Sequence, residues 1–184
     1  MRVISGEFRG RRLKSLATKS TRPTLDRVKE SIFNIIGPYF DGGLCLDLFA
    51  GSAALGIEAV SRGMSQAVLV EYNFKAMQVI KSNIEIINAK DRFKLLKKDA
   101  TAALFDLVNL CFDLIFLDPP YKEQEIKMQL EKLQDLNLLT KKAVVVAKTA
   151  VNVVLPQRVR ALTQYRKQIY GTTAVLFFKE ISND

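Results

Sequence analysis

The chain has 184 residues, is 48% hydrophobic and carries a formal net charge of +9. This length suits one compact domain, and no run of about eighteen apolar residues predicts a membrane span. The sequence contains no histidine and only two cysteines, Cys45 and Cys111, which excludes Ser–His and Cys–His nucleophilic catalysis and the common zinc-ligand sets. We therefore expect two buried reduced thiols and no metal. The basic N-terminus lacks the apolar stretch of a signal peptide and predicts a cytoplasmic location.

The positive charge is concentrated in the first 40 residues, which hold nine Lys and Arg but only three Asp and Glu. This bias favours a polyanionic partner, most simply a nucleic acid, and the structural alternative is a solvated basic terminus. Residues 22–29 can also serve as a structural clasp on the domain. The side chains that we expect to contact RNA phosphates are Arg11, Arg12, Arg22 and Arg27.

The first elements differ in pattern from the rest of the chain. Residues 2–16 predict a β-hairpin with a turn at Arg9–Gly10, and a polar loop follows. Asp26 is suited to cap a helix whose apolar residues recur at helical spacing, and Gly37–Pro38 ends that helix. We expect residues 1–40 to form a basic extension and residues 41–184 to form a single compact domain.

Strand and helix patterns alternate from residue 44 onward. Near-continuous apolar strands separated by helices indicate a parallel sheet that is covered on both faces. The last two strands, around a turn at Gly171–Thr172, predict an antiparallel addition. The expected fold is therefore α/β, a doubly wound, mostly parallel seven-stranded sheet. Its expected strands are 44–49, 66–71, 92–98, 112–117, 143–148, 164–171 and 173–179, and its helices 53–63, 73–88, 100–108 and 123–136.

A glycine-rich turn follows the first of these strands. Gly51, Ala53 and Gly56 stand at the spacing G-x-G-x-x-G, with alanine in the middle place. Such a turn brings the backbone close to a ligand at a helix N-terminus. Glu71 ends the next strand, where an acid accepts both hydroxyls of a ribose. The pair predicts an adenosine-type ligand, and the alternative is a tight turn beside a surface acid.

Asp99 follows the third strand and has two interpretations. Its side chain is suited to cap the next helix, which begins near Ala100. It can also accept a hydrogen bond from the amino group of an adenine that lies across the strand ends. Both roles are compatible in one residue.

The sequence Asp118-Pro119-Pro120-Tyr121 ends the fourth strand. In a doubly wound sheet, the ends of the first and fourth strands flank the switch point where ligands bind. The prolines fix the backbone, so the Pro119 carbonyl and the Asp118 carboxylate can accept both hydrogens of a planar NH2 group. Tyr121 provides a ring on which a base can stack. A simple stop signal is the structural alternative.

These motifs resemble class I S-adenosylmethionine-dependent methyltransferases that modify exocyclic amines. The segments RVISGEFRGRRLKS, STRPTLDRVKESIFNII, LDLFAGSAALGIEAVSRG and FDLIFLDPPY resemble the RsmD family more closely. That family methylates the N2 amine of a guanine in 16S ribosomal RNA, either naked or in an assembling 30S particle, and we expect a monomer. The resemblance implies catalytic roles for Asp118, Pro119 and Tyr121. It implies a cofactor site of Asp47, Phe49, Gly51, Ala53, Glu71, Asp99, Ala100 and Asp118.

Three positions depart from the pattern of that family. The family usually has glycine where Ala53 stands, Glu-His after the fifth strand where this chain has Ala147-Lys148, and aspartate where Thr172 stands. These departures keep alternatives open. One is methyl transfer to DNA adenine or protein glutamine, and another is an RNA-binding or assembly protein with weakened or lost catalysis. A nicotinamide enzyme accounts for Gly51 and Glu71 but leaves the Asp-Pro-Pro-Tyr sequence unexplained.

Overall fold

The computed structural model describes residues 1–16, 22–119 and 123–181, without the side chains of residues 22–25 and 123–125. Its centre is one eight-stranded sheet in the order β3-β2-β1-β4-β5-β8-β7-β6. The strands β1 (Leu44–Asp47), β2 (Gln66–Val70), β3 (Phe93–Leu96), β4 (Phe112–Leu117) and β5 (Leu139–Ala150) are parallel. The strands β6 (Arg158–Val159), β7 (Leu162–Tyr170) and β8 (Thr173–Glu180) add antiparallel pairs.

The expected fold class is confirmed, with β6 as an additional two-residue edge strand. The chain runs outward from β1 to β3 and then returns to β4 on the other side of β1, so the strand order reverses between β1 and β4. The ends of β1 and β4 therefore lie side by side, and Asp47 pairs with Phe116 across them. This is the topological switch point at which ligands bind in such sheets.

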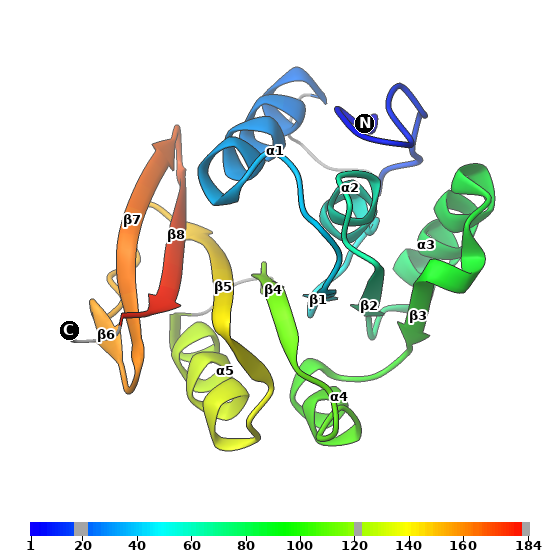
Figure 1. The fold of residues 1–184 in the computed structure, drawn as a ribbon. Helices are drawn as coiled ribbons and strands as arrows, with labels where there is room; N and C mark the ends of the chain where they lie inside the picture. Colours follow the sequence, from blue (N-terminus) through cyan, green and yellow to red (C-terminus); the bar gives the residue numbers. More distant parts are fainter. Residues whose placement is uncertain (17–21, 120–122, 182–184) are drawn as a thin grey trace.

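Helices cover both faces of the sheet (Figure 1). One side holds α1 (Arg22–Ile36), α2 (Ala54–Ser61), α3 (Phe74–Ile87) and the N-terminal segment. The other side holds α4 (Ala100–Asp106) and α5 (Glu123–Asp135), and η1 (Lys90–Arg92) precedes β3. Successive strand residues serve opposite layers: Cys45 packs into the first apolar core and Leu46 into the second. This alternation explains why the central strands contain apolar residues at successive positions.

The predicted N-terminal hairpin is present in a short and irregular form, in which residues 1–3 pair with residues 11–13. Residues 1–16 contain one antiparallel bridge, between Arg2 and Arg12. Val3 N donates to Arg11 O, and Leu13 N donates to Met1 O. The connection between the paired residues bonds to α2, where Glu7 N donates to Ser61 O at 2.8 Å. Gly6 permits this close approach: its φ is +85°, and a Cβ there would lie 1.8 Å from Ser61 O. The segment therefore curls onto α2.

Two smaller expectations also require correction. Asp26 does not cap α1, which begins at Arg22 and has Pro23 in its first turn, where proline is well tolerated. Only Cys45 is a buried thiol; Cys111 is exposed because it lies in the connection before β4. Asn73 does cap α3, since its side chain accepts a hydrogen bond from Ala76 N.

A buried ionic cluster attaches the N-terminal segment and α1 to α2. The Glu58 carboxylate is 0% exposed and pairs with Lys29 Nζ at 3.0 Å and Arg62 Nε at 2.8 Å. The same carboxylate accepts hydrogen bonds from the backbone N–H groups of Ile4 and Ser5. Burial lowers the pKa of Lys29, and the adjacent Glu58 opposes that shift. For Lys29, the structure therefore supports the structural clasp that was the alternative to RNA contact.

Candidate active site

Three acidic side chains follow the carboxyl ends of neighbouring strands. Asp47 ends β1, Glu71 follows β2 and Asp118 follows β4. Asp47 pairs with Leu69 on one side and Phe116 on the other, so Glu71 and Asp118 each lie two residues beyond its partners. Parallel register thus brings the three carboxyl groups to one edge of the sheet.

Asp47 is the buried member of this acidic group. It is 2% exposed, and its Oδ2 accepts a hydrogen bond from Gly56 N at 3.1 Å. Burial is the main cause that raises the pKa of Asp47 to about 7, with further increases from the charges of Asp118 and Glu71, while the Gly56 bond opposes the rise. Burial therefore penalises the ionised form, and a cationic ligand at this edge would favour it.

The raised pKa of Asp47 predicts a specific dependence of stability on pH. Between its ordinary value of 3.8 and about 7, the folded chain binds more protons than the unfolded chain. The free energy of unfolding therefore falls as the pH rises through this interval. We expect Asp47→Asn to remove this contribution, with a gain on the order of 3 kcal/mol at pH 8 relative to pH 4.

Urea unfolding of Asp47→Asn and the parent chain at several pH values measures this difference. Asp91→Asn, at an exposed aspartate of η1, is the control and should follow the parent at every pH. An Asp47→Asn profile parallel to that of the parent would contradict the assigned pKa.

Hydrogen bonds from the backbone hold the glycine-rich loop against Glu71. The two carboxylate oxygens of Glu71 accept from Gly51 N at 2.9 Å and from Asn73 N at 2.7 Å. Gly56 brings α2 close to the sheet, since a Cβ there would lie 2.4 Å from Leu69 Cδ2. The loop, Glu71 and the start of α2 therefore form one connected unit beside Asp47.

The other expected cofactor residues surround this edge of the sheet. Asp99 caps α4, because its Oδ1 accepts from Thr101 N and Ala102 N. The predicted capping role of Asp99 is thus confirmed. The second carboxylate oxygen of Asp99, Oδ2, does not take part in either of these two bonds. Ala100 is buried at the start of α4, and Phe49 follows β1 and packs partly against the second apolar core. Their roles toward a cofactor stay predictions.

Asp118 forms an ion pair that the sequence did not reveal. Lys148 Nζ lies 2.7 Å from Asp118 Oδ2, and both side chains are about one third exposed. The parallel pairing of Leu117 with Ala147 places Lys148 level with Asp118. Pro119 is buried next to it, while Tyr121 lies outside the described residues. The contact could have been predicted only if the register between β4 and β5 had been known.

The chain is similar over nearly its whole length to known proteins. The model of the family described as "Conserved hypothetical protein 95" matches residues 1–179. The chain belongs to this family. One relative is YlbH of Bacillus subtilis (strain 168), which is provisionally named an rRNA methyltransferase. It is 48% identical to this chain, and the match covers 98% of this chain and 99% of YlbH. "Ribosomal RNA small subunit methyltransferase D" of Escherichia coli (strain K12) is 30% identical over 97% of this chain and 89% of its own.

Solved structures agree with this assignment. The Escherichia coli protein yhhF, provisionally named a methyltransferase, has a TM-score of 0.85, with 30% identity over 98% of this chain and 97% of its own. The resemblance to the RsmD family is therefore confirmed. A more distant structure, SMU.776 complexed with SAH, covers 86% of this chain and 50% of its own at 15% identity. Its TM-score of 0.68 reflects a shared fold.

The structure shows the surroundings of two departures from the usual family pattern. Ala53 has a φ of +62°, in the left-handed region that glycine adopts most readily, and its methyl group is buried. Ala147 lies inside β5, within the expected strand 143–148, and is buried in the second apolar core. An acid at 147 would therefore be enclosed at this position. Thr172 lies in the turn between β7 and β8, and nothing in the structure explains this substitution.

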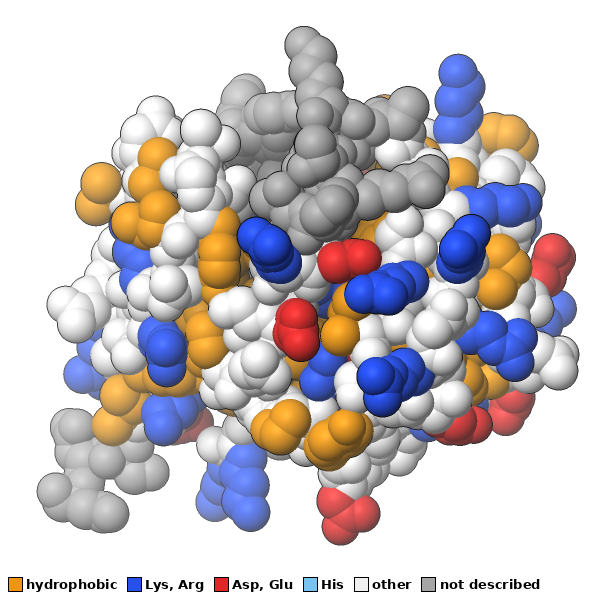
Figure 2. Space-filling view, turned by 90° about the horizontal axis from the view of Figure 1, so that it is seen from above, with side chains coloured by type: hydrophobic (Ala, Val, Ile, Leu, Met, Phe, Trp, Pro, Cys, Tyr) orange, Lys and Arg blue, Asp and Glu red, His pale blue; other side chains and the backbone are white. Residues whose placement is uncertain are grey.

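Cationic side chains gather on the face of α1 and the N-terminal segment. Figure 2 shows more Lys and Arg than Asp and Glu side chains on this face. Arg11, Arg12 and Arg27 are exposed, and the side chain of Arg22 lies outside the described residues. Arg11 also donates to Ile86 O at 3.1 Å, so its guanidinium already contacts α3. Arg12 and Arg27 are therefore the more available of the expected phosphate contacts.

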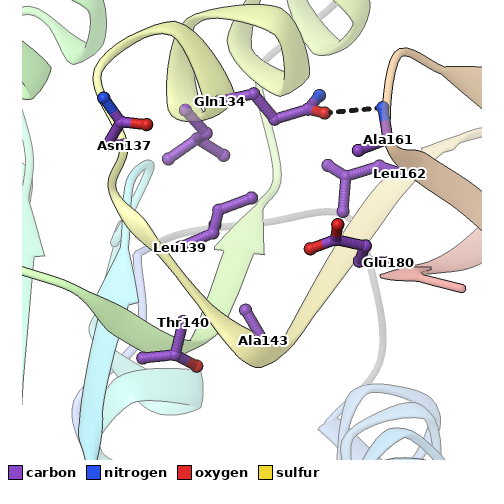
Figure 3. Close-up of a pocket in the computed structure, with 9 residues that line it drawn as sticks. Gln134, Asn137, Leu139, Thr140, Ala143, Ala161, Leu162 and Glu180 are labelled. Carbon is purple, nitrogen blue, oxygen red and sulfur yellow. Dashed lines mark hydrogen bonds between the residues drawn. The ribbon is translucent and has the colours of Figure 1, made fainter. Parts of the chain in front are cut away.

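Two cavities lie at the opposite end of the sheet. The first, of about 210 Å³, is lined by residues of α5, the start of β5, the start of β7 and the end of β8 (Figure 3). There Gln134 Oε1 accepts from Ala161 N at 3.0 Å. The second, of about 470 Å³, includes Gly43 before β1 and Asp113 near the start of β4. Both are remote from the acidic edge, because parallel strands place their amino ends together.

Residues 1–16, 22–119 and 123–181 contain no group of three His, Cys, Asp or Glu side chains that could hold a metal. None of the described helices is long and apolar enough to cross a membrane.

Proposed function

We propose that this chain transfers a methyl group from S-adenosylmethionine to the exocyclic N2 amine of a guanine in small-subunit ribosomal RNA. The observation that carries this proposal is the convergence of Asp47, Glu71 and Asp118 at the switch point between β1 and β4. The printed names of the curated relatives support ribosomal RNA as the substrate. The proposal includes a cytoplasmic monomer that acts on the RNA or on an assembling 30S particle.

The acidic edge suits the charge of the proposed cofactor. S-adenosylmethionine supplies an electrophilic methyl group on a positively charged sulfonium. Ionised Asp47 and Asp118 would be stabilised by a cation between them, which offsets the cost of burying Asp47. Glu71 retains acceptor capacity for ribose hydroxyls, because each carboxylate oxygen can accept more than one hydrogen bond. Asp99 has Oδ2 for an adenine amino group.

Asp118 and the Pro119 carbonyl would hold the amine that receives the methyl group. The N2 amine of guanine is a weak nucleophile because its lone pair is delocalised into the ring. Acceptors on both of its hydrogens favour a more pyramidal nitrogen and stabilise the positive charge that develops there. Lys148 occupies Oδ2 of Asp118, so Oδ1 is the oxygen we assign to the amine. The released proton can pass to Asp118 or to water, and Tyr121 remains the proposed stacking ring.

The N-terminal cations would position the RNA without reading its sequence. We expect the logarithm of the RNA association constant to fall linearly with the logarithm of salt concentration. Arg12→Ala and Arg27→Ala should each reduce the size of this slope by about 0.7 to 0.9, as expected for one lost phosphate contact. Fluorescence anisotropy over a salt series measures the slope.

Lys167→Ala is the matched control for these arginine variants. Lys167 is also exposed, but it lies on β7, which is next to the outermost strand β6 and is separated from β1 by three other strands. The expected slope for this control equals that of the parent chain. Unchanged slopes for both arginine variants would move the RNA surface to another part of the molecule.

A labelled-methyl assay on small-subunit RNA, DNA and protein tests the proposed substrate directly. Mass-spectrometric mapping of methylated guanines, with and without the chain, then identifies the modified position. Transfer to adenine or glutamine instead of guanine would contradict the substrate assignment. Absence of S-adenosylmethionine binding in isothermal titration would contradict the enzyme and support a noncatalytic RNA-binding protein.

A further inference from the structure

One buried side chain connects the N-terminal segment to the glycine-rich loop. Asn83, on α3, is 0% exposed. Its Nδ2 donates to Lys14 O and to Ser52 O, each at 2.9 Å, and its Oδ1 accepts from Lys14 N at 2.7 Å. A single amide group therefore satisfies three backbone groups from two distant segments.

The two segments held by Asn83 belong to different parts of the proposed site. Ser52 lies between Gly51, whose N–H donates to Glu71, and Ala53, which has the left-handed backbone. Lys14 belongs to the basic segment, which Arg11 also attaches to α3 through Ile86 O. Asn83 thus contacts the backbone of the expected RNA-binding segment and the backbone of the expected cofactor loop.

We propose that Asn83 is a positioning residue that couples RNA binding to cofactor binding. This inference rests on the proposed function. Contacts that order residues 11–14 on the RNA would strengthen the bonds of Asn83 and thereby order the Ser52 carbonyl. A loop that is already ordered loses less conformational entropy when it binds its ligand. By thermodynamic reciprocity, the cofactor must then strengthen RNA binding by the same factor.

Amide hydrogen exchange tests the coupling in the unaltered chain. Addition of S-adenosylhomocysteine should slow the exchange of the Lys14 amide, which is bonded to Asn83 Oδ1. The Ala161 amide is the matched control, because it also donates to a side-chain amide oxygen, that of Gln134, beside the remote cavity (Figure 3). We expect no change there. Equal effects on both amides, or none on Lys14, would overturn the coupling.

The second measurement compares the effect of RNA on cofactor affinity in the parent chain and in two variants, Asn83→Leu and Gln134→Leu. We expect small-subunit ribosomal RNA to tighten the binding of S-adenosylhomocysteine to the parent chain by about fivefold or more. Asn83→Leu, which keeps a similar volume but cannot form the bonds, should bring this factor close to one. Gln134→Leu also removes bonds from a side-chain amide to three backbone groups, but at the remote cavity, and should keep the parent factor.

The outcomes separate the coupling from the proposed function. If the parent chain binds both ligands independently, the coupling is wrong and the proposed function stands. If it binds neither ligand, both are wrong. If Asn83→Leu does not fold, as judged by circular dichroism, the exchange of the Lys14 amide in the parent chain decides.

Discussion

Asp118→Ala is expected to lower the rate of methyl transfer by about a hundredfold or more while cofactor binding persists. The substitution removes one of two acceptors that would stabilise charge on the reacting nitrogen. Loss of a comparable preorganised contact in another enzyme costs about 3–4 kcal/mol of transition-state stabilisation. Glu71 and the glycine-rich loop, which would hold the nucleoside, keep their mutual hydrogen bonds in this variant. Single-turnover kinetics and isothermal titration measure the two effects separately.

Two further substitutions sharpen this test. Asp118→Asn keeps a carbonyl oxygen as acceptor but loses the charge, so its rate should lie between those of the parent and Asp118→Ala. Asp113→Asn is the matched control on the same strand. Asp113 lies at the opposite end of β4, where its carboxylate accepts from Leu44 N and Thr140 Oγ1. That variant should keep the parent rate, and near-normal turnover of Asp118→Ala would exclude the proposed mechanism.

Glu58→Ala is expected to destabilise the fold by about 3–5 kcal/mol, the range for breaking a buried ion pair by removing one partner. The substitution leaves Lys29 and Arg62 buried, without the carboxylate that neutralises them. It also removes the acceptor of the Ile4 and Ser5 N–H groups, so the N-terminal segment loses two of its bonds to α2 and keeps those to Ser61. In the variant, the Arg62 guanidinium keeps its hydrogen bond to Pro38 O. Its contact with the Phe33 ring, where Cζ lies 4.8 Å from the ring centre, also stays.

Urea denaturation measures the change in the free energy of unfolding. Glu85→Ala provides the control, since Glu85 is an exposed glutamate on α3 and should change stability by no more than about 0.5 kcal/mol. Hydrogen exchange at Ile4 and Ser5 should accelerate in Glu58→Ala more than in the control. A loss below about 1 kcal/mol would show that the cluster contributes little to stability.

The elements that were predicted well depend on short-range patterns. β4 was expected at residues 112–117 and has these bounds, because five of its six residues are apolar and the run is flanked by a loop and by prolines. Asn73 caps α3 through a bond to a residue three positions away. The hairpin is less regular than expected because the backbone N–H groups of Ile4, Ser5 and Phe8 bond to side chains of α2, more than fifty residues along the chain.

In the candidate site, too, the features that depend on nearby residues were predicted, and those that depend on distant residues were not. Its acids were located in advance, because an acid at the end of an apolar strand in a doubly wound sheet must lie at the ligand-binding edge. The ion pair of Asp118 was not predicted. Lys148 lies 30 positions from Asp118 in the sequence, and the contact depends on the register of β4 and β5. The bounds of β5 were predicted only in part, since the strand extends beyond the expected residues 143–148 at both ends.

Local chemistry was therefore enough to establish the strand–helix alternation, the glycine turn and the acidic strand ends. These features depend on backbone preferences and on apolar periodicity within about ten residues. The pKa of Asp47, the ion pair of Lys148, the Glu58 cluster and the bonds of Asn83 were decided by folding. Each depends on burial or on the distance between side chains that are far apart in the chain, and only packing of the sheet and helices determines those quantities.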